Sequence, residues 1–166
     1  MRFYHILIIL IAFYITGCRN TAEPFRSVVI PQGFIVYFDE DSIVSNIQTF
    51  VKQHDKTMFV LYNSDCSACL ISVSLWLKFA KEHPEVTPVF AVHTEQGQRL
   101  FWVQTYMYYQ PPIYVFFDKE CQFFLANKID RSHDTFIVDS TGKVIIEGRI
   151  QDKAFKKQYV KKSKQK

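Results

Sequence analysis

The apolar residues of the chain fall into short continuous runs and longer stretches, and these patterns predict different elements. Three short runs have the uniform apolarity typical of strands buried on both faces of a sheet. They are residues 57–62, 88–93 and 113–117. Three longer stretches predict helices over residues 42–54, 67–82 and 96–109. Ser42 is the expected N-cap of the first of these helices. Buried strands that alternate with helices indicate an α/β fold with a mixed sheet.

Two shorter signals mark the ends of the predicted domain. Residues 35–38 are apolar enough for a short strand near its beginning. Near its end, residues 135–138 and 144–147 flank a turn sequence with Gly142 where a positive φ is needed. These two segments predict a C-terminal β-hairpin. The chain contains no internal repeat, so we expect a single domain over residues 34–152.

The first 33 residues predict export and attachment to a membrane. Residues 1–17 contain one Arg, then a continuous apolar run and a small residue, which is the pattern of a signal peptide. Residues 15–18, Ile-Thr-Gly-Cys, resemble the bacterial lipobox, and this resemblance implies that Cys18 is lipidated. The alternatives are an uncleaved signal anchor and an ordinary signal peptide with a chance cysteine. Residues 18–33 have no periodicity and contain two prolines, which predicts a tether.

Charge is distributed unevenly along the chain. Residues 153–166 contain seven lysines and no acidic residue, and they predict a solvated basic tail. Between Cys18 and Asp152 there are 12 basic and 16 acidic residues, so the body is mildly acidic. A nucleic-acid-binding domain needs its positive charge on a folded face, and we therefore expect no nucleic-acid partner. A content of 48% apolar and 22% charged residues excludes disorder throughout.

One short motif carries chemistry. The sequence Cys66-Ser-Ala-Cys69 lies where a buried strand is predicted to end and a helix to begin. The first turn of a helix stabilises a thiolate through its unpaired N–H groups and its dipole. The i, i+3 spacing also brings the two sulfurs close enough for a disulfide. We expect Cys66 to be the exposed, attacking thiol and Cys69 to be the resolving thiol.

Other roles are known for two cysteines at this spacing. A zinc site needs four ligands, and Cys121 is the only other cysteine of the predicted domain, so we expect no metal. Covalent haem attachment requires a histidine after the second cysteine, where this chain has Leu70. An inert structural disulfide in an exported protein stays open as an alternative. A redox-active pair would need no cofactor, because the cysteines themselves carry two electrons.

The segment TMFVLYNSDCSAC (57–69), the apolar helix after it and the segment DTFIVDSTGKVIIEG (134–148) resemble thioredoxin-fold proteins. The resemblance is closest to exported, membrane-tethered thiol–disulfide oxidoreductases, which include redoxin-like bacterial lipoproteins. It implies a three-layer sandwich, in which helices flank a central mixed β-sheet and the sheet ends in the C-terminal hairpin.

Two positions depart from the pattern of that family. Thioredoxin-type enzymes have a cis-proline just before the first strand of the hairpin, and this chain has His133 and Asp134 there. Both residues are expected to border the substrate groove, where His133 would be an acid or base beside the sulfurs or a solvent-exposed loop residue. Asp65 precedes Cys66, where its carboxylate would either oppose thiolate formation or have no redox role. Cys121 is expected to be a buried apolar thiol or a partner in a second exchange.

These features predict thiol–disulfide exchange on exported proteins in the bacterial cell envelope. The expected partners are exported proteins that contain disulfides or dithiols, and a membrane redox partner that restores the pair. The lipid on Cys18 would anchor the domain to a membrane, facing the periplasm or the exterior. The alternative from a different class is a non-catalytic binding or assembly lipoprotein on the same scaffold.

Overall fold

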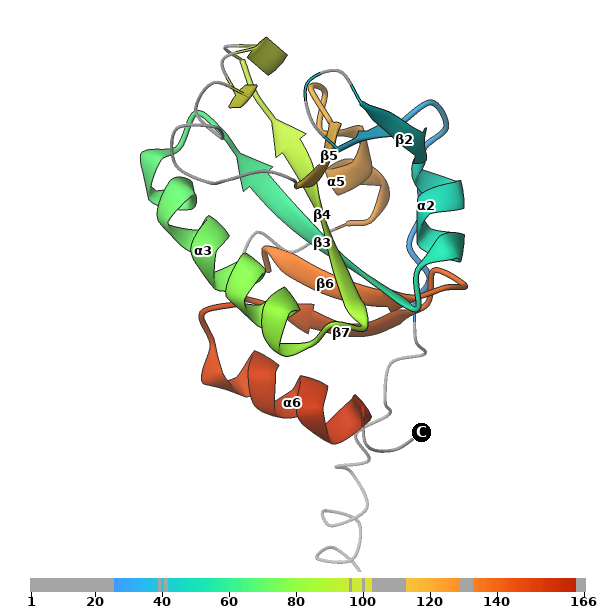
Figure 1. Ribbon diagram of the computed structural model, residues 1–166, viewed down its shortest axis with the longest axis vertical. Helices are drawn as coiled ribbons and strands as arrows, with labels where there is room; N and C mark the ends of the chain where they lie inside the picture. The colour runs from blue at the N-terminus through green and yellow to red at the C-terminus, as the bar shows by residue number, and fades with distance from the viewer. Residues whose placement is uncertain are drawn as a thin grey trace, which may run out of the picture.

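The structure is a computed structural model that describes residues 26–38, 40, 42–95, 97–99, 101–102, 113–128 and 133–163. Within these residues a seven-stranded mixed sheet has the order β2-β1-β5-β4-β3-β6-β7 (Figure 1). The strands are β1 (Ile35–Tyr37), β2 (Ile43–Asn46), β3 (Lys56–Asn63), β4 (Val86–His93), β5 (Tyr114–Phe117), β6 (Thr135–Asp139) and β7 (Val144–Gly148). The three apolar runs of the sequence form β3, β4 and β5, which are parallel to one another. The predicted buried strands are therefore confirmed.

Helices cover both faces of this sheet, as Figure 1 shows. Among the described residues they are α2 (Ile47–Gln53), α3 (Ser67–Glu82), α5 (Gln122–Ala126) and α6 (Lys153–Ser163). Trp76 and Phe79 of α3 pack on one face with residues of α6. Phe50 of α2 and Phe123 of α5 pack on the other. The predicted three-layer α/β sandwich is confirmed.

The predicted C-terminal hairpin is also confirmed, since β6 and β7 are antiparallel neighbours. The Asp139 carboxylate accepts hydrogen bonds from the N–H groups of Thr141 and Lys143, at 2.9 and 3.1 Å. Gly142 has φ +83°, a conformation that glycine adopts without a steric penalty. β6 is antiparallel to β3, with Asp139 opposite Lys56. The hairpin turn therefore lies at the edge of the sheet where β3 begins.

The first predicted helix begins later than its apolar spacing indicated. Residues 43–46 form β2, which is antiparallel to β1, and Ile43 is 67% exposed. The N-cap of α2 is Asn46, not Ser42, because the Asn46 side-chain oxygen accepts a hydrogen bond from the Thr49 N–H at 2.9 Å. Pairing with β1 satisfies the backbone of this β-branched segment, and local periodicity contains no information on that pairing.

The predicted solvated tail is largely a helix that packs on the domain. Phe155 and Tyr159, four residues apart on one face of α6, are 3% and 0% exposed. Lys56 Nζ donates a hydrogen bond to the Tyr159 hydroxyl at 2.9 Å. Gly148 lets the helix approach β7, since a Cβ at this glycine would lie 3.1 Å from Phe155 Cδ2. The expectation of a solvated tail was wrong for residues 153–163, because burial of these two aromatic side chains outweighs the solvation of the lysines around them.

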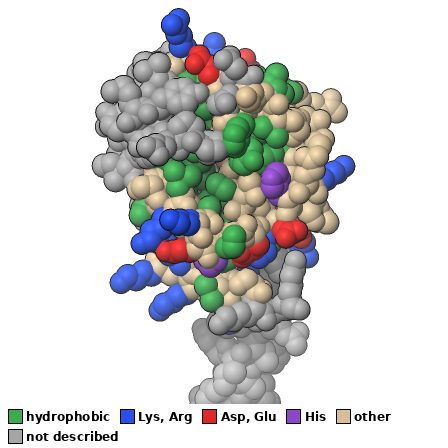
Figure 2. All heavy atoms as spheres, viewed as in Figure 1, with side chains coloured by type: hydrophobic (Ala, Val, Ile, Leu, Met, Phe, Trp, Pro, Cys, Tyr) green, Lys and Arg blue, Asp and Glu red, His purple; other side chains and the backbone are tan. Residues whose placement is uncertain are grey.

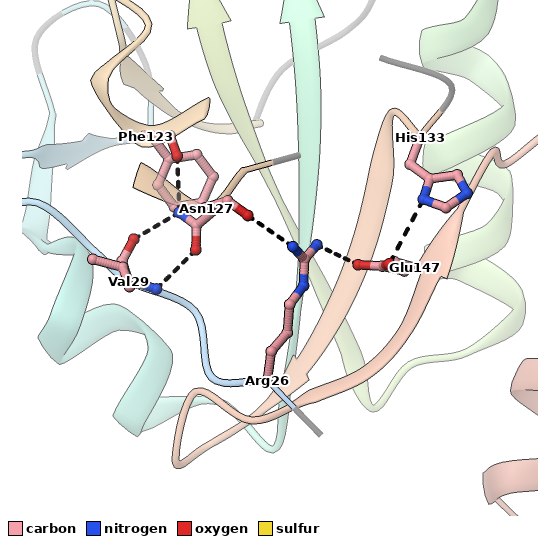
Figure 3. A network of polar contacts seen from close by, with 6 residues as sticks. All are labelled: Arg26, Val29, Phe123, Asn127, His133 and Glu147. Atoms are coloured by element: carbon pink, nitrogen blue, oxygen red, sulfur yellow. Dashed lines mark hydrogen bonds and ion pairs between the residues drawn. The ribbon is translucent and has the colours of Figure 1, made fainter. Parts of the chain in front are cut away.

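The predicted tether is shorter than expected, because residues 26–30 dock on the domain (Figure 3). The Asn127 side chain bridges the Val29 backbone, accepting from its N–H at 2.8 Å and donating to its oxygen at 2.7 Å. Arg26 donates to the backbone oxygen of Asn127 at 2.7 Å and forms an ion pair with Glu147. The Val28 N–H donates to Gly142 of the hairpin turn at 2.8 Å. The tether prediction was therefore wrong from residue 26 onward.

Several predictions concern residues outside the described ranges. They include the signal peptide over residues 1–17, the lipidation of Cys18 and most of the helix predicted over residues 96–109. None of the helices in the described part of the chain has both the length and the apolarity needed to cross a membrane.

Candidate functional site

The cysteine pair lies at the junction of β3 and α3, as predicted. The backbone oxygen of Asn63 accepts a hydrogen bond from the Cys66 N–H at 3.3 Å, and its side-chain oxygen accepts one from the Asp65 N–H at 2.9 Å. Cys66 is the N-cap of α3, and its backbone oxygen accepts a hydrogen bond from the Cys69 N–H at 2.9 Å. Cys66 therefore precedes the first turn of a 16-residue helix, and Cys69 lies within that turn.

The environment of Cys69 keeps it protonated. Burial raises the pKa of the Cys69 thiol to about 11, and both a hydrogen bond to Cys66 and the negative charge of Asp134 act in the same direction. A thiol with this pKa is almost entirely in the S–H form at neutral pH. Cys66 lies at the positive end of the α3 dipole, which favours a negative charge by about 0.3–1 kcal/mol. Cys66 and Cys69 are both half-buried, so the expectation that Cys66 is the exposed thiol was wrong. The helix dipole at Cys66 and the raised pKa of Cys69 nevertheless suit an attacking Cys66 and a resolving Cys69.

A cavity of about 440 Å³ opens beside the pair. Cys69, His133 and Asp134 line it, so the structure brings together three residues that the sequence assigned to the site. Apolar side chains form part of its wall, as is usual for sites that bind ligands. They include Leu61, Ala91 and Phe124.

Hydrogen bonds fix Asp134 at the cavity wall. Its backbone oxygen accepts a hydrogen bond from the Leu61 N–H of β3 at 2.8 Å. Its carboxylate accepts one from the Thr135 hydroxyl at 2.7 Å. The Thr135 hydroxyl in turn accepts one from the indole N–H of Trp76, in α3, also at 2.7 Å. This chain of hydrogen bonds holds the carboxylate in a fixed position relative to the helix that contains Cys69.

His133 and Asp65 are placed differently from Asp134. His133 lines the cavity, but its Nδ1 lies 3.7 Å from a carboxylate oxygen of Glu147, toward which Figure 3 shows the ring to point. Asp65 is exposed, and its carboxylate accepts a hydrogen bond from the Glu95 N–H at 2.8 Å. That bond ties the loop before Cys66 to the loop after β4. The Asp65 carboxylate therefore has a structural role at this loop as well as lying next to Cys66 in the sequence.

Three further polar residues line the cavity, and no local pattern in the sequence connects them with Cys69: His93, Asp118 and Cys121. His93 is the last residue of β4, and Asp118 follows β5 directly. Because the carboxyl ends of parallel strands meet at one edge of a sheet, this position was a usable signal. Cys121 is only half-buried, so the expectation of a fully buried apolar thiol was wrong. No cluster of three or more His, Cys, Asp or Glu side chains suited to a metal ion occurs in the described part of the chain.

Comparison with known proteins identifies the fold. No family model and no curated protein matches the sequence. A candidate thiol:disulfide interchange protein DsbE from Chlorobium tepidum has a similar structure, with a TM-score of 0.59, 14% identity, and coverage of 83% of this chain and 96% of that chain. The exposed lipoprotein thioredoxin of Streptococcus pneumoniae has a TM-score of 0.53, 19% identity, and coverage of 78% and 98%. A candidate protein disulfide isomerase from Bacteroides thetaiotaomicron has a TM-score of 0.54, 14% identity, and coverage of 85% and 89%.

The chain has a thioredoxin-like fold. Its Cys66–Cys69 pair lies at the end of a central strand, and the fold is related to that of thiol:disulfide interchange proteins. At 14–19% identity the similarity establishes the architecture alone. The activity of this thioredoxin-like domain must therefore be argued from its own side chains.

Proposed function

We propose that this thioredoxin-like protein exchanges disulfides with exported proteins through Cys66 and Cys69. The observation that carries the proposal is the asymmetry of the pair. Cys66 is the N-cap at the start of α3, and Cys69 lines the cavity with its pKa raised to about 11 by burial. An inert structural disulfide needs neither this asymmetry nor an adjoining cavity.

The exchange proceeds in two steps. The Cys66 thiolate attacks one sulfur of a substrate disulfide, whose other sulfur leaves as a thiolate, and a mixed disulfide forms. Cys69 then loses its proton and attacks the Cys66 sulfur, which releases the second substrate thiolate. The substrate gains two electrons, and the pair becomes a disulfide. We assign Asp134 as the proton acceptor, because it lines the same cavity and its charge acts on Cys69.

A redox titration of the full chain tests this function. The protein is equilibrated in thiol buffers, alkylated, and analysed by intact mass. We expect a Cys66–Cys69 couple between about −120 and −270 mV, the range of known exchange proteins. Cys121→Ser is the matched control and should keep the couple, whereas Cys66→Ser should lose it. A pair that resists reduction below about −300 mV, or that never forms a disulfide, would leave the domain a non-catalytic binding scaffold.

The proposed location is the cell envelope, with lipid on Cys18. Residues 18–25 would be the tether, with an extended length of about 28 Å. Arg26 and Val28 contact the hairpin turn at the edge where β3 begins, and Cys66 follows the other end of this strand, about 25 Å away. The tether would therefore enter the domain at the end opposite the cysteine pair. The edge of the sheet that carries Cys66 and Cys69 would face away from the membrane. Exported partner proteins could reach it there, and so could a membrane redox partner whose domain extends above the lipid.

The basic face of α6 supports this orientation. Tyr159 contacts Lys56 at the beginning of β3, and Lys162 Nζ donates to the Ile145 backbone oxygen of β7 at 2.6 Å. Figure 2 shows basic side chains gathered toward the lower end of the molecule, where Figure 1 places α6. Labelled palmitate should be incorporated into the full chain and lost in a Cys18→Ala variant. Equal labelling of both chains would contradict the lipid anchor.

A further inference from the structure

The cavity beside Cys69 contains a second thiol next to an imidazole. Cys121 Sγ lies 3.4 Å from His93 Nδ1, which is hydrogen-bond distance for sulfur, and the same nitrogen lies 3.4 Å from the backbone oxygen of Asp118. Nδ1 can accept the thiol proton in the tautomer that has its hydrogen on Nε2. His93 ends β4, and Cys121 follows β5 by a short turn. Since β3, β4 and β5 are parallel neighbours, this pair lies at the same edge of the sheet as the cysteine motif after β3. One cavity therefore has thiols from two distant parts of the sequence on its wall.

The backbone holds Cys121 in an unusual conformation. Its φ of +54° and ψ of +27° are left-handed, a region that costs a residue with a Cβ about 1 kcal/mol or more. The Cys121 N–H donates to the Asp118 backbone oxygen at 3.1 Å, and the Leu125 N–H donates to the Cys121 oxygen at 2.9 Å. Such strain persists where the surrounding structure over-determines it, and it is concentrated at functional sites.

A buried carboxylate completes the group. Asp118 is 5% exposed and lines the same cavity. Its Oδ2 accepts a hydrogen bond from the Phe123 N–H at 3.0 Å, whereas its Oδ1 has no hydrogen-bond partner among the described residues. Burial raises the pKa of the Asp118 carboxyl, and the backbone N–H groups that it accepts from and the nearby His93 act in the opposite direction. Burial and the negative charge of Asp118 both raise the pKa of the Cys121 thiol.

We propose that Cys121 and His93 form a second thiol centre that takes over the disulfide of the Cys66–Cys69 pair by exchange inside the cavity. This inference rests on the proposed function. Cys69 is the sulfur that Cys121 attacks, because Cys69 lines the cavity with Cys121 and Cys66 is not part of its lining. After the exchange the disulfide would join Cys69 and Cys121. Cys66 would again be a thiolate that can attack a substrate.

The step conserves atoms and electrons. The Cys121 thiol gives its proton to His93, and the Cys121 thiolate attacks the Cys69 sulfur. The Cys66–Cys69 bond breaks as the Cys69–Cys121 bond forms. Cys66 leaves as a thiolate at the N-terminus of α3. One disulfide and one thiol are present before and after the step, so no external oxidant or reductant takes part.

Peptide mapping of the oxidised full chain tests the proposal. Trypsin leaves Cys66 and Cys69 together in residues 57–78, Cys121 in residues 120–128, and Cys18 in a separate peptide. The Cys66→Ser chain is oxidised with diamide, which takes up the two electrons and becomes its hydrazine. The chain is then digested with trypsin without a reductant. We expect the two peptides to be cross-linked within one monomer. A Cys69→Ser chain is the matched control, and its cross-link yield should be at least about tenfold lower, because Cys66 is not part of the cavity wall.

The possible outcomes separate the two proposals. If wild-type protein forms the Cys66–Cys69 disulfide but Cys66→Ser forms no cross-link, the second thiol centre is wrong and the proposed function survives. If wild type forms neither disulfide, both proposals fail. If circular dichroism shows that the Cys66→Ser chain is unfolded, the wild-type chain with one disulfide is used in its place. Its remaining thiol, labelled with iodoacetamide, should then be found on Cys66, and a label confined to Cys121 would overturn the inference.

The role of His93 has its own readout. At neutral pH a His93→Gln variant should form the Cys69–Cys121 cross-link at least about tenfold more slowly, since a general base contributes at least this much to a proton transfer. As the pH rises and hydroxide deprotonates Cys121 directly, the two rates should converge. A slow rate that is equally slow at all pH values would indicate a purely structural role and would remove His93 from the proposed centre.

Discussion

Raising the pH from 7 to 10 should increase the rate at which iodoacetamide alkylates Cys69 about tenfold for each pH unit. Only the thiolate reacts, and burial raises the pKa of this thiol from an ordinary value of 9.0 to about 11. At pH 8 the thiolate is therefore about one part in a thousand, against about one part in ten for an ordinary thiol. The higher basicity makes each thiolate roughly six- to tenfold more nucleophilic, so Cys69 should react about tenfold more slowly than an unperturbed cysteine.

The assay follows single alkylation of the reduced full chain at early times, and fragment-ion mass spectrometry assigns the label to Cys66 or Cys69. The matched control is the same chain in denaturing urea, where burial is lost and the Cys69 rate should level off near pH 9. Circular dichroism at each pH confirms that the native samples stay folded. A Cys69 rate that levels off near pH 9 in the folded protein would refute the burial argument and the resolving role that rests on it.

Two further predictions concern the segments whose packing the sequence did not indicate. Phe155→Ala should lower the free energy of unfolding in urea by about 3–5 kcal/mol, because it empties a buried site beneath α6. Lys157→Ala, on the exposed side of the same helix, should change it by less than about 0.5 kcal/mol, and equal effects would mean that α6 does not stabilise the domain. Asn127→Ala removes the side chain that bridges Val29 and should cost about 1–3 kcal/mol, with faster trypsin cleavage after Arg26. Exposed Gln122→Ala is its control, and an unchanged cleavage rate for Asn127→Ala would show that residues 26–30 are not held by Asn127.

The sequence predicted those elements whose signal is local. Continuous apolar runs gave the central strands, since a strand buried on both faces has no polar side to alternate with. Local signals predicted both ends of α3, because the CxxC motif marks its beginning and Pro84 follows its end. Helical spacing failed at Ile43, because β2 exists only through its pairing with β1. Phe155 and Tyr159 among the lysines gave no clear signal for α6, because they stabilise the helix only by packing on core residues from other parts of the chain.

The sequence by itself determined where the cysteine pair lies, because a strand, a helix start and the i, i+3 spacing are all contained in one short segment. The resemblance to thioredoxin-fold proteins also implied that His133 and Asp134 border the groove, and both line the cavity. Only the tertiary structure decided what else borders that cavity. His93 and Cys121 lie far along the chain from Cys69, and parallel pairing of β3, β4 and β5 brings their strand ends to one edge of the sheet. A contact between residues so distant in the sequence depends on strand order and register, which local patterns of polarity do not encode.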